Sequence, residues 1–289
     1  MIELLKVVVV KFKQLGKTKE KIPAIGMGTW EIEDTAEVVR SLLAGLKLGA
    51  RFIDTAELYG TEPVVAKVLQ KDDDVFIATK VLPSHFSYNN VIKACDASLK
   101  KLGVKQIDLY QLHWPNPLIP IEETMKAMEH LVEAGKIRYI GVSNFSVKRM
   151  KKAQDVLKKN EIVSNQVIYN PFAREIEKDI IPFCDKEKIT TIAYRPLDRG
   201  KIFERKPEIM KAIEEIAEKY GKTSAQVTLN WLCTRNSVVA IPKASTVAHA
   251  KENVTSLDFT LKKEDIKKID DASSGFSYPS WGKTILSKL

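Results

Sequence analysis

The sequence predicts an α/β protein: a closed (β/α)8 barrel, or TIM barrel, in a single domain that spans residues 1–289. Eight short runs rich in β-branched residues alternate with stretches in which apolar residues recur every three or four positions. This alternation is typical of parallel strands joined by helices. No low-complexity linker divides the chain, and no G-x-G-x-x-G follows the first strand, which disfavours an open doubly wound sheet.

The predicted strands are short, as expected for strands that are buried on both faces. They lie at Ile22–Gly26, Arg51–Asp54, Val75–Thr79, Ile107–Leu112, Ile137–Val142, Ile162–Val167, Thr190–Ala193 and Val238–Ile241. Before them, the β-branched run Val7–Val10 and a turn-like segment at 16–19 predict a small N-terminal β-hairpin. After the last unit we expect a C-terminal loop over residues 275–289.

The intervening helices are predicted from apolar spacing and from start signals. Helical spacing of apolar residues occurs within Ala36–Leu46, Met125–Val132 and Ile209–Tyr220. Ser146 and Thr223 each precede a further helical stretch, and a hydroxyl side chain in that place caps the first turn.

Composition excludes several classes of protein. Lys and Arg number 46 and Asp and Glu 37, so the net charge is +9, but the two signs are interleaved along stretches such as 211–222. A nucleic-acid partner is therefore not expected, since its footprint would be a basic patch or stripe. The three cysteines lack paired spacing, which argues against a metal site or a disulfide framework. No apolar run approaches the roughly 20 residues that span a bilayer, so no membrane association is expected.

We expect a cytoplasmic protein that is a monomer or a weak homodimer. Residues 1–10 do not fit a secretory signal, because Lys6 interrupts the apolar run and no small-residue cleavage site follows. The last residues, Ser287-Lys288-Leu289, match a peroxisomal address, which would apply only if the source is eukaryotic.

Polar residues follow the apolar runs at the ends of consecutive predicted strands. Asp54, Lys80 and His113 end or directly follow three of them, and Tyr59 lies five residues after Asp54. In a (β/α)8 barrel these ends meet at one rim, where the chemistry takes place. An Asp54–Lys80 ion pair would hold Lys80 charged, and a buried cation beside a phenol lowers its pKa from about 10. Tyr59 would then be a proton donor near neutral pH, and His113 could orient a carbonyl oxygen.

With these residues in place, the chain resembles the aldo-keto reductase superfamily over nearly its whole length. Besides Lys80, the resemblance rests on six motifs: Gly28-Thr29-Trp30, Asp54-Thr55-Ala56-Glu57-Leu58-Tyr59-Gly60, Leu109–Pro115, Gly141-Val142-Ser143-Asn144-Phe145, Ala193–Leu197, and Ile241–Ser245 with Glu252-Asn253. It implies hydride transfer between NADP(H) and an aldehyde, ketone or alcohol. It also implies that Tyr59 donates the proton, Asp54 and Lys80 tune Tyr59, and His113 positions the oxygen, without a metal.

The resemblance also implies how the nicotinamide half of the cofactor would be held. Ser143, Asn144 and Gln166 would bind the carboxamide, and Tyr194 would stack on the ring. Thr29 and Asp54 would contact the ribose, and Pro196 and Leu197 would lie along the pyrophosphate. Gly28 and Trp30, from the same motif as Thr29, are also expected to bind the cofactor.

The adenosine end departs from the family pattern. Lys243 and Ser245 match residues that hold the 2′-phosphate of NADP, with Glu252 and Asn253 beside them, but His249 occupies a position where strongly NADP-specific members have Arg. Histidine cannot form the guanidinium fork and is mostly neutral at pH 7. We therefore expect NADP(H) to be preferred less strictly, with NAD(H) also usable.

Arg195 is a second departure, because the family often has Ser or Thr before Pro196-Leu197. Two interpretations stay open from sequence alone. Arg195 adds a cation at the pyrophosphate, or it is a solvent-exposed residue paired with Asp198.

On the substrate side, Trp30 and Trp114 match aromatic pocket positions of the family, and such a wall suits an apolar or aromatic aldehyde. The short connection at 116–120 predicts an open cleft and broad specificity. The predicted substrate residues are Trp30, Tyr59, Phe86, His113, Trp114 and Trp281.

Two other functions remain alternatives. A strand-end Lys80 could form a Schiff base as an aldolase nucleophile, but that role needs a lowered pKa, and Asp54 would raise the pKa of Lys80. A non-catalytic, cofactor-sensing barrel is the second alternative, and the intact set of four polar residues argues against it.

Overall fold

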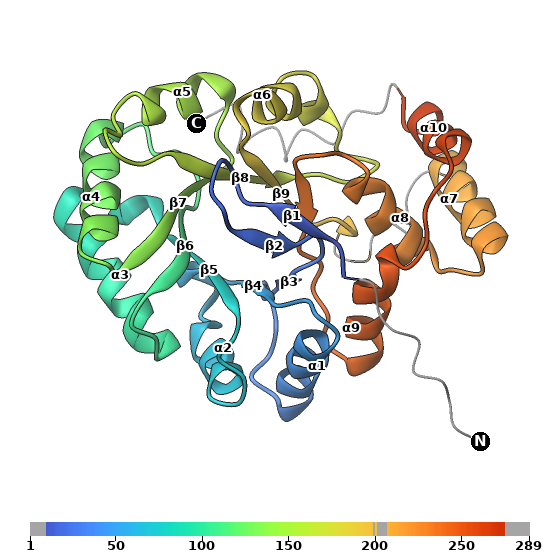
Figure 1. Ribbon diagram of the computed structural model, residues 1–289, viewed down its shortest axis with the longest axis horizontal. Coiled ribbons are helices and arrows are strands. Elements are labelled where there is room, and N and C mark those ends of the chain that lie inside the picture. Colours follow the sequence, from blue (N-terminus) through green and yellow to red (C-terminus); the bar gives the residue numbers. More distant parts are fainter. Residues whose placement is uncertain (1–9, 199, 201–206, 275–289) are drawn as a thin grey trace.

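The computed structural model describes residues 10–198, 200 and 207–274, which form a barrel of eight parallel strands surrounded by helices (Figure 1). The strands are β3 to β10, each hydrogen-bonded to the next in sequence order. They are Met27–Gly28 (β3), Phe52–Asp54 (β4), Phe76–Val81 (β5), Ile107–Leu112 (β6), Ile137–Ser143 (β7), Ile162–Ile168 (β8), Thr190–Tyr194 (β9) and Val238–Ala240 (β10). The barrel closes where parallel bridges join Ile25 to Ala240 and Gly28 to Lys243.

A helix follows each barrel strand, so the strands run parallel, as the sequence predicts. Two helices, α7 and α8, separate β9 from β10, and α10 follows the last unit on the side of α7 (Figure 1). The helices are Ala36–Lys47 (α1), Glu62–Leu69 (α2), Tyr88–Leu102 (α3), Ile121–Glu133 (α4), Val147–Gln154 (α5), Ile180–Glu187 (α6), Pro207–Tyr220 (α7), Ser224–Cys233 (α8), Val247–Val254 (α9) and Lys263–Ala272 (α10).

An N-terminal hairpin covers the end of the barrel opposite the strand C-termini. Its strands, Phe12–Gln14 (β1) and Lys21–Pro23 (β2), pair antiparallel and lie across the barrel mouth in Figure 1. Leu15 and Ile22 of the hairpin are fully buried and pack with Phe52 and Leu109 inside the barrel. The hairpin thus seals this end with apolar side chains and leaves the other end for a site.

The predicted barrel strands agree with the structure to within two residues at their ends, except the first, and the first hairpin strand is Phe12–Gln14, which lies after the predicted run Val7–Val10. The two predicted caps form: Ser146 accepts from the backbone N–H of Arg149, and Thr223 makes a reciprocal capping box with Gln226. The predicted first strand, Ile22–Gly26, is divided, because its start pairs with β1 and the barrel strand begins after Gly26. A Cβ at Gly26 would lie 2.5 Å from the ring of Phe52, so the chain passes this ring in close contact as it joins β10 in the barrel wall.

Residues 1–9 and 275–289 lie outside the described residues, and with them the predicted strand start at Val7 and the C-terminal loop. Within the described part of the chain, none of the helices combines the length and apolar character needed to cross a bilayer.

Lys13 anchors the hairpin to the barrel. Its ammonium donates to the carbonyl oxygens of Cys233 (2.8 Å), Arg235 (2.5 Å) and Val238 (2.6 Å). Lys13→Met would leave three partly buried carbonyls without this donor, and we expect the free energy of unfolding to fall by about 2–3 kcal/mol. Chemical denaturation would measure the loss. The exposed Lys11→Met is the matched control, expected to change stability by less than about 0.5 kcal/mol; equal losses in both variants would contradict the anchoring role.

Candidate active site

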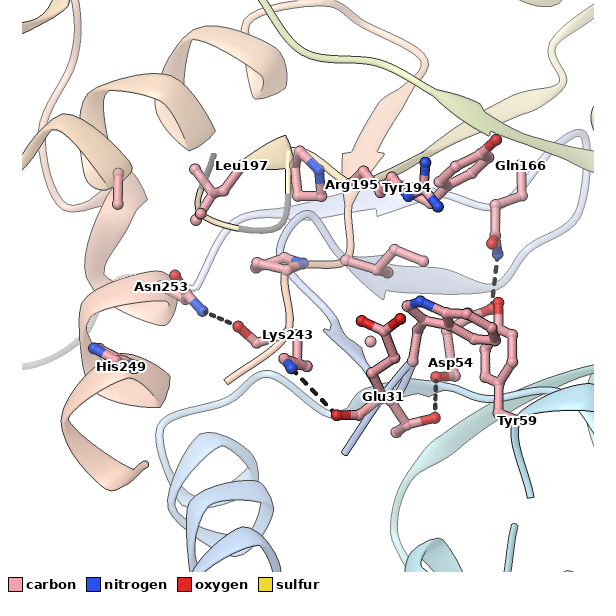
Figure 2. Close-up of a pocket in the computed structure, with 18 of the residues that line it drawn as sticks. Glu31, Asp54, Tyr59, Gln166, Tyr194, Arg195, Leu197, Lys243, His249 and Asn253 are labelled. Atoms are coloured by element: carbon pink, nitrogen blue, oxygen red, sulfur yellow. Dashed lines mark hydrogen bonds between the residues drawn. The ribbon is translucent and has the colours of Figure 1, made fainter. Parts of the chain in front are cut away.

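A long cavity of about 1140 Å³ opens at the C-terminal ends of the barrel strands. Figure 2 shows Tyr59 and Asp54 at one end and His249 at the other, with Lys243 between them. Pockets that hold one small molecule are typically about 300–1,000 Å³, so this cavity has room for a cofactor together with a substrate. Its walls come from the ends of β3, β4 and β6 to β10, from the start of α8 and from one side of α9.

A buried ion pair lies beneath the Tyr59 end of the cavity. The Lys80 ammonium, on β5, is fully buried and lies 2.6 Å from Asp54 Oδ1 on the neighbouring strand β4. It also donates to the carbonyl oxygen of Thr55 at 2.7 Å. These contacts fix the ammonium at one place between two strands.

Tyr59 places its phenol above this ammonium. The phenol oxygen lies 3.3 Å from Lys80 Nζ and 3.5 Å from His113 Nε2. The Tyr59 ring packs edge-on against Trp30, at 4.6 Å between ring centroids, and His113 is flanked by Trp114. The sequence therefore predicts correctly that Asp54, Tyr59, Lys80 and His113 meet at one place.

The turn that carries Tyr59 is held by side chains on both flanks. The Thr61 hydroxyl lies 2.9 Å from that of Thr55 and 3.0 Å from that of Thr29, which ties the two ends of the turn to β3. Glu57 accepts from the backbone N–H of Leu82 at 3.0 Å and so ties the turn to the segment after β5. The Tyr59 position is thus fixed relative to Lys80.

Burial controls the protonation of the catalytic candidates. It raises the pKa of Tyr59 above its usual range, and the Lys80 ammonium offsets only part of this effect. This corrects the expectation of a lowered pKa: the phenol stays neutral. Burial, aided by the Lys80 charge, lowers the pKa of His113 to about 2, so its imidazole is neutral.

Lys80 itself stays charged. Burial alone would lower the pKa of its ammonium, but the contacts with Asp54 and Tyr59 raise this pKa above its usual range. A charged amine is not a nucleophile, which removes the support for a Schiff-base role.

Four residues with amide or hydroxyl groups line the middle of the cavity and contact one another. Tyr194 donates its hydroxyl to Asn144 Oδ1 at 3.0 Å, and Asn144 Nδ2 lies 3.0 Å from Ser143 Oγ. The Ser143 hydroxyl donates to the carbonyl oxygen of Gln166 at 2.9 Å, and Gln166 Nε2 donates to Asp54 Oδ2 at 2.7 Å (Figure 2). The register of β7 and β8 shifts just before this point, at Ile140 and Gly141, as is common next to active sites.

Backbone strain gathers around the cavity. Three of its non-glycine lining residues, Glu31, Asn144 and Arg195, have φ of 57°, 59° and 49°, in the left-handed region. Such residues persist only where the surrounding structure holds them, and they cluster at functional sites. Arg195 is held by hydrogen bonds from Asn170 and Asp198 to its carbonyl oxygen. Its place in the cavity wall, beside a buried Asp198, favours the cavity interpretation over a solvent-exposed pair.

The far end of the cavity is formed by the segment after β10 and by α9. Lys243 is exposed, and its ammonium donates to the carbonyl oxygen of Glu31 at 3.2 Å (Figure 2). Asn253 donates to the carbonyl oxygen of Lys243 at 3.4 Å. His249 lies on the first turns of α9, exposed and facing the cavity.

Two of the predicted residues that the structure describes do not line the cavity, and a third falls outside the described part of the chain. Phe86 is 1% exposed and packs in the core between strands and helices, because its chain segment turns inward before α3. Ser245 lies near the cavity but does not line it. Trp281 is outside the described residues. All other predicted catalytic, cofactor and substrate residues line the cavity, except Lys80, which is buried beneath it.

Sequence reasoning missed several residues of the site. Gln111 lies buried under Asp54, and its signal was a polar residue inside an apolar strand. Thr223, Ser224 and Ala225 line the wall because α8 begins at the cavity, which a capping signal alone does not reveal. Glu31 gave no signal, since an isolated Glu in a loop is ordinarily solvated.

The cavity fits a dinucleotide cofactor. Gly28 has no room for a side chain in the cavity wall, because a Cβ there would lie 2.7 Å from the carbonyl oxygen of Ile241. The same cavity is lined by the aromatic ring of Tyr194, the amides of Asn144 and Gln166, and the cations Arg195 and Lys243. Among the described residues, no group of three His, Cys, Asp or Glu side chains is placed to hold a metal ion.

Comparisons with known proteins agree with this geometry. The model of the Aldo/keto reductase family matches residues 24–274. A methylglyoxal reductase of Escherichia coli is 37% identical over 274 residues, which are 92% of this chain and 94% of the relative. A glyoxal reductase of Bacillus subtilis is 34% identical, covering 86% of this chain and 88% of the relative.

Solved structures give the same result. A thermostable aldo-keto reductase in complex with the inhibitor epalrestat is 39% identical, with a TM-score of 0.85, covering 91% of this chain and 99% of its own. An aldo/keto reductase from Klebsiella pneumoniae in complex with NADP and acetate is 35% identical, with a TM-score of 0.83 and coverage of 91% and 95%. Because the family model matches most of the chain and the relatives cover nearly all of it, this chain belongs to the aldo/keto reductase family.

Proposed function

We propose that this protein is an NADP(H)-dependent carbonyl reductase, working also in reverse on alcohols, with Tyr59 as the proton donor. The observation that carries the proposal is the placement of the Tyr59 phenol, 3.3 Å from the buried Lys80 ammonium and 3.5 Å from His113 Nε2, at the inner end of the cavity. The NADP bound in the Klebsiella pneumoniae relative supports the cofactor.

The chain's own residues perform the proton chemistry. His113, neutral and facing the phenol, donates a hydrogen bond from Nε2 to the carbonyl oxygen and orients it. Tyr59 gives its proton to that oxygen, and the Lys80 ammonium stabilises the phenolate that this leaves. NADPH, when bound, would supply the hydride that the carbonyl carbon accepts. Tyr59 then regains a proton from solvent.

The cofactor lies along the cavity wall in this proposal. Ser143, Asn144 and Gln166 hold the carboxamide, and Tyr194 stacks on the nicotinamide ring. Arg195, which lines the same wall, is the added cation at the pyrophosphate. Lys243 binds the 2′-phosphate, and the lack of a guanidinium at His249 lets NAD(H) serve as well.

Trp30, Leu58 and Trp114 surround the carbonyl position and suit an apolar or aromatic aldehyde. The named relatives act on small dicarbonyls, methylglyoxal and glyoxal, which supports a small-molecule substrate. A cytoplasmic monomer or weak homodimer remains our proposal for its location and assembly.

Removal of the phenol proton should abolish turnover. In Tyr59→Phe we expect kcat for aldehyde reduction to fall by about 10²–10⁴-fold, because the general acid is lost while the cavity keeps its shape. Loss of reduced-nicotinamide absorbance measures kcat, and fluorescence titration measures NADPH affinity, which should be unchanged. Tyr88→Phe, on α3 outside the cavity, is the matched control. Wild-type kcat in Tyr59→Phe would refute the assignment of the proton donor.

The pH dependence follows from burial. The pKa of Tyr59 is raised and that of His113 is lowered to about 2, so both groups are neutral at physiological pH. We expect kcat for reduction, at saturating cofactor, to be flat from about pH 6 to about pH 9 and to fall only as the phenol ionises above that range. An ionisation near pH 6.5 that disappears in His113→Gln would contradict the neutral imidazole.

Cofactor choice should respond to position 249. In His249→Arg we expect the ratio of kcat/KM for NADPH over NADH to rise about tenfold, because a guanidinium forms charge-assisted hydrogen bonds to the 2′-phosphate. Lys251→Arg, an exposed position on α9 outside the cavity, is the matched control. An unchanged ratio in His249→Arg would show that this position does not read the phosphate.

A further inference from the structure

Gln111 is a buried polar residue in the middle of the barrel. It lies on β6, where its neighbours Tyr110 and Leu112 are fully buried in the outer core, and it is itself fully buried. Burial of a side-chain amide costs free energy unless its groups are hydrogen-bonded, so an apolar residue would be favoured here for stability alone.

The Gln111 amide contacts the catalytic carboxylate. Asp54 Oδ1 faces Lys80, whereas Oδ2 accepts from Gln166 Nε2 at 2.7 Å and from Gln111 Nε2 at 3.2 Å. The two amides also meet each other, with 3.5 Å between Gln166 Nε2 and Gln111 Oε1. Each oxygen of the carboxylate therefore has its own set of donors.

This pattern permits one orientation of the Gln111 amide. An ionised carboxylate only accepts hydrogen bonds, so Gln111 must turn its NH₂ group to Asp54. Its oxygen is then left for the NH₂ group of Gln166, which lines the cavity. The amide thus links the carboxylate under Tyr59 to a residue in the cavity wall.

The barrel reserves space for this side chain. Asp54, Gln111 and Gln166 come from β4, β6 and β8, alternate strands that supply one layer of the barrel interior. On β7, between β6 and β8, Gly141 leaves the room: a Cβ there would lie 2.8 Å from Gln111 Cγ and 2.6 Å from Ser164 Oγ. Such a layer is ordinarily filled by branched apolar residues, but here three of its strands, β4, β6 and β8, contribute polar side chains.

We propose that Gln111 is a positioning residue of the reaction: its amide holds Asp54 with Oδ1 turned to Lys80 and joins it to Gln166. This inference rests on the proposed function, since its effect on rate passes through Lys80 and Tyr59. With the Gln111 donor gone, Asp54 is held on its second oxygen by Gln166 alone. The negative charge of Asp54 is then less well compensated and repels a phenolate at Tyr59 more strongly, which raises the free energy of the phenolate.

The pKa of the Tyr59 phenol depends on the charged groups that face it from neighbouring strands. Lys80 from β5 favours the phenolate and Asp54 from β4 disfavours it, while Arg195 after β9 favours it weakly. His113 after β6 is neutral. Gln111 carries no net charge and contacts Asp54, so a change of the Tyr59 pKa in a Gln111 variant reports a change at the Asp54–Lys80 pair or in the burial of the phenol.

Two variants test the proposal. Gln111→Met keeps the length of the side chain and removes the donor. We expect kcat to fall about tenfold, the size of one hydrogen bond to a charged group, with KM for the carbonyl within about twofold of wild type. The Tyr59 pKa should rise in the cofactor-free protein, as followed by NMR of ¹³C-labelled tyrosine with the Tyr59 signal identified by its absence from Tyr59→Phe.

Gln111→Glu is the rescue variant. A Glu beside Asp54 has a raised pKa, because two adjacent carboxylates do not both ionise readily. When protonated it donates to Asp54, so we expect near wild-type kcat at low pH and a new loss of kcat as this carboxyl ionises, at lower pH than the loss in wild type. A residue that only fills space would produce no such pH dependence.

The outcomes separate this proposal from the proposed function. Wild-type kcat and Tyr59 titration in Gln111→Met, with no new ionisation in Gln111→Glu, would overturn the positioning role. If wild type reduced no carbonyl, the proposed function would fall, yet a shifted Tyr59 pKa in Gln111→Met would still uphold the link through Asp54. Should Gln111→Met not fold, the pH profile of Gln111→Glu decides the matter alone.

Discussion

The buried ion pair between Lys80 and Asp54 is the constraint on which the site depends. Neither group is more than 2% exposed, and two charges taken out of water cost several kcal/mol each unless their geometry and further hydrogen bonds compensate. Here the 2.6 Å contact, the Thr55 carbonyl and the amides of Gln111 and Gln166 provide that compensation. Apolar residues would fill the barrel interior without this desolvation cost, which agrees with the chemical role that we propose for the pair.

The barrel architecture makes the compensation possible. Adjacent parallel strands place Asp54 and Lys80 side by side, and alternate strands bring the two amides into the same layer from across the interior. The hairpin seals the opposite end with Leu15 and Ile22 and so shields the pair from water on that side. The strained backbone at Asn144 and Arg195 then sets the wall along which a cofactor can lie.

Much of this arrangement could be predicted from the sequence, because short motifs specify it. Polar residues at the ends of apolar runs located Asp54, Lys80 and His113, and the rule that barrel strands end at one rim brought them together. The fate of Phe86 could not be predicted, since an aromatic residue in a loop serves a pocket wall or a core equally well. The division of Ile22–Gly26 into a hairpin strand and a barrel strand could not be predicted either, because the apolar pattern does not show that the start of this segment pairs with β1.

The protonation of Tyr59 shows why motifs alone are insufficient for mechanism. Proximity to a cation suggests a lowered pKa, but the pKa is raised, because burial of the phenol outweighs the attraction of Lys80. The two effects act at different moments of the reaction. In the reaction we propose, burial keeps the proton on Tyr59 before a carbonyl oxygen is present, and Lys80, already charged and fixed, stabilises the phenolate once the proton has moved. A donor that is neutral at rest and stabilised after transfer is better suited to reduction near neutral pH than a phenol that ionises beforehand.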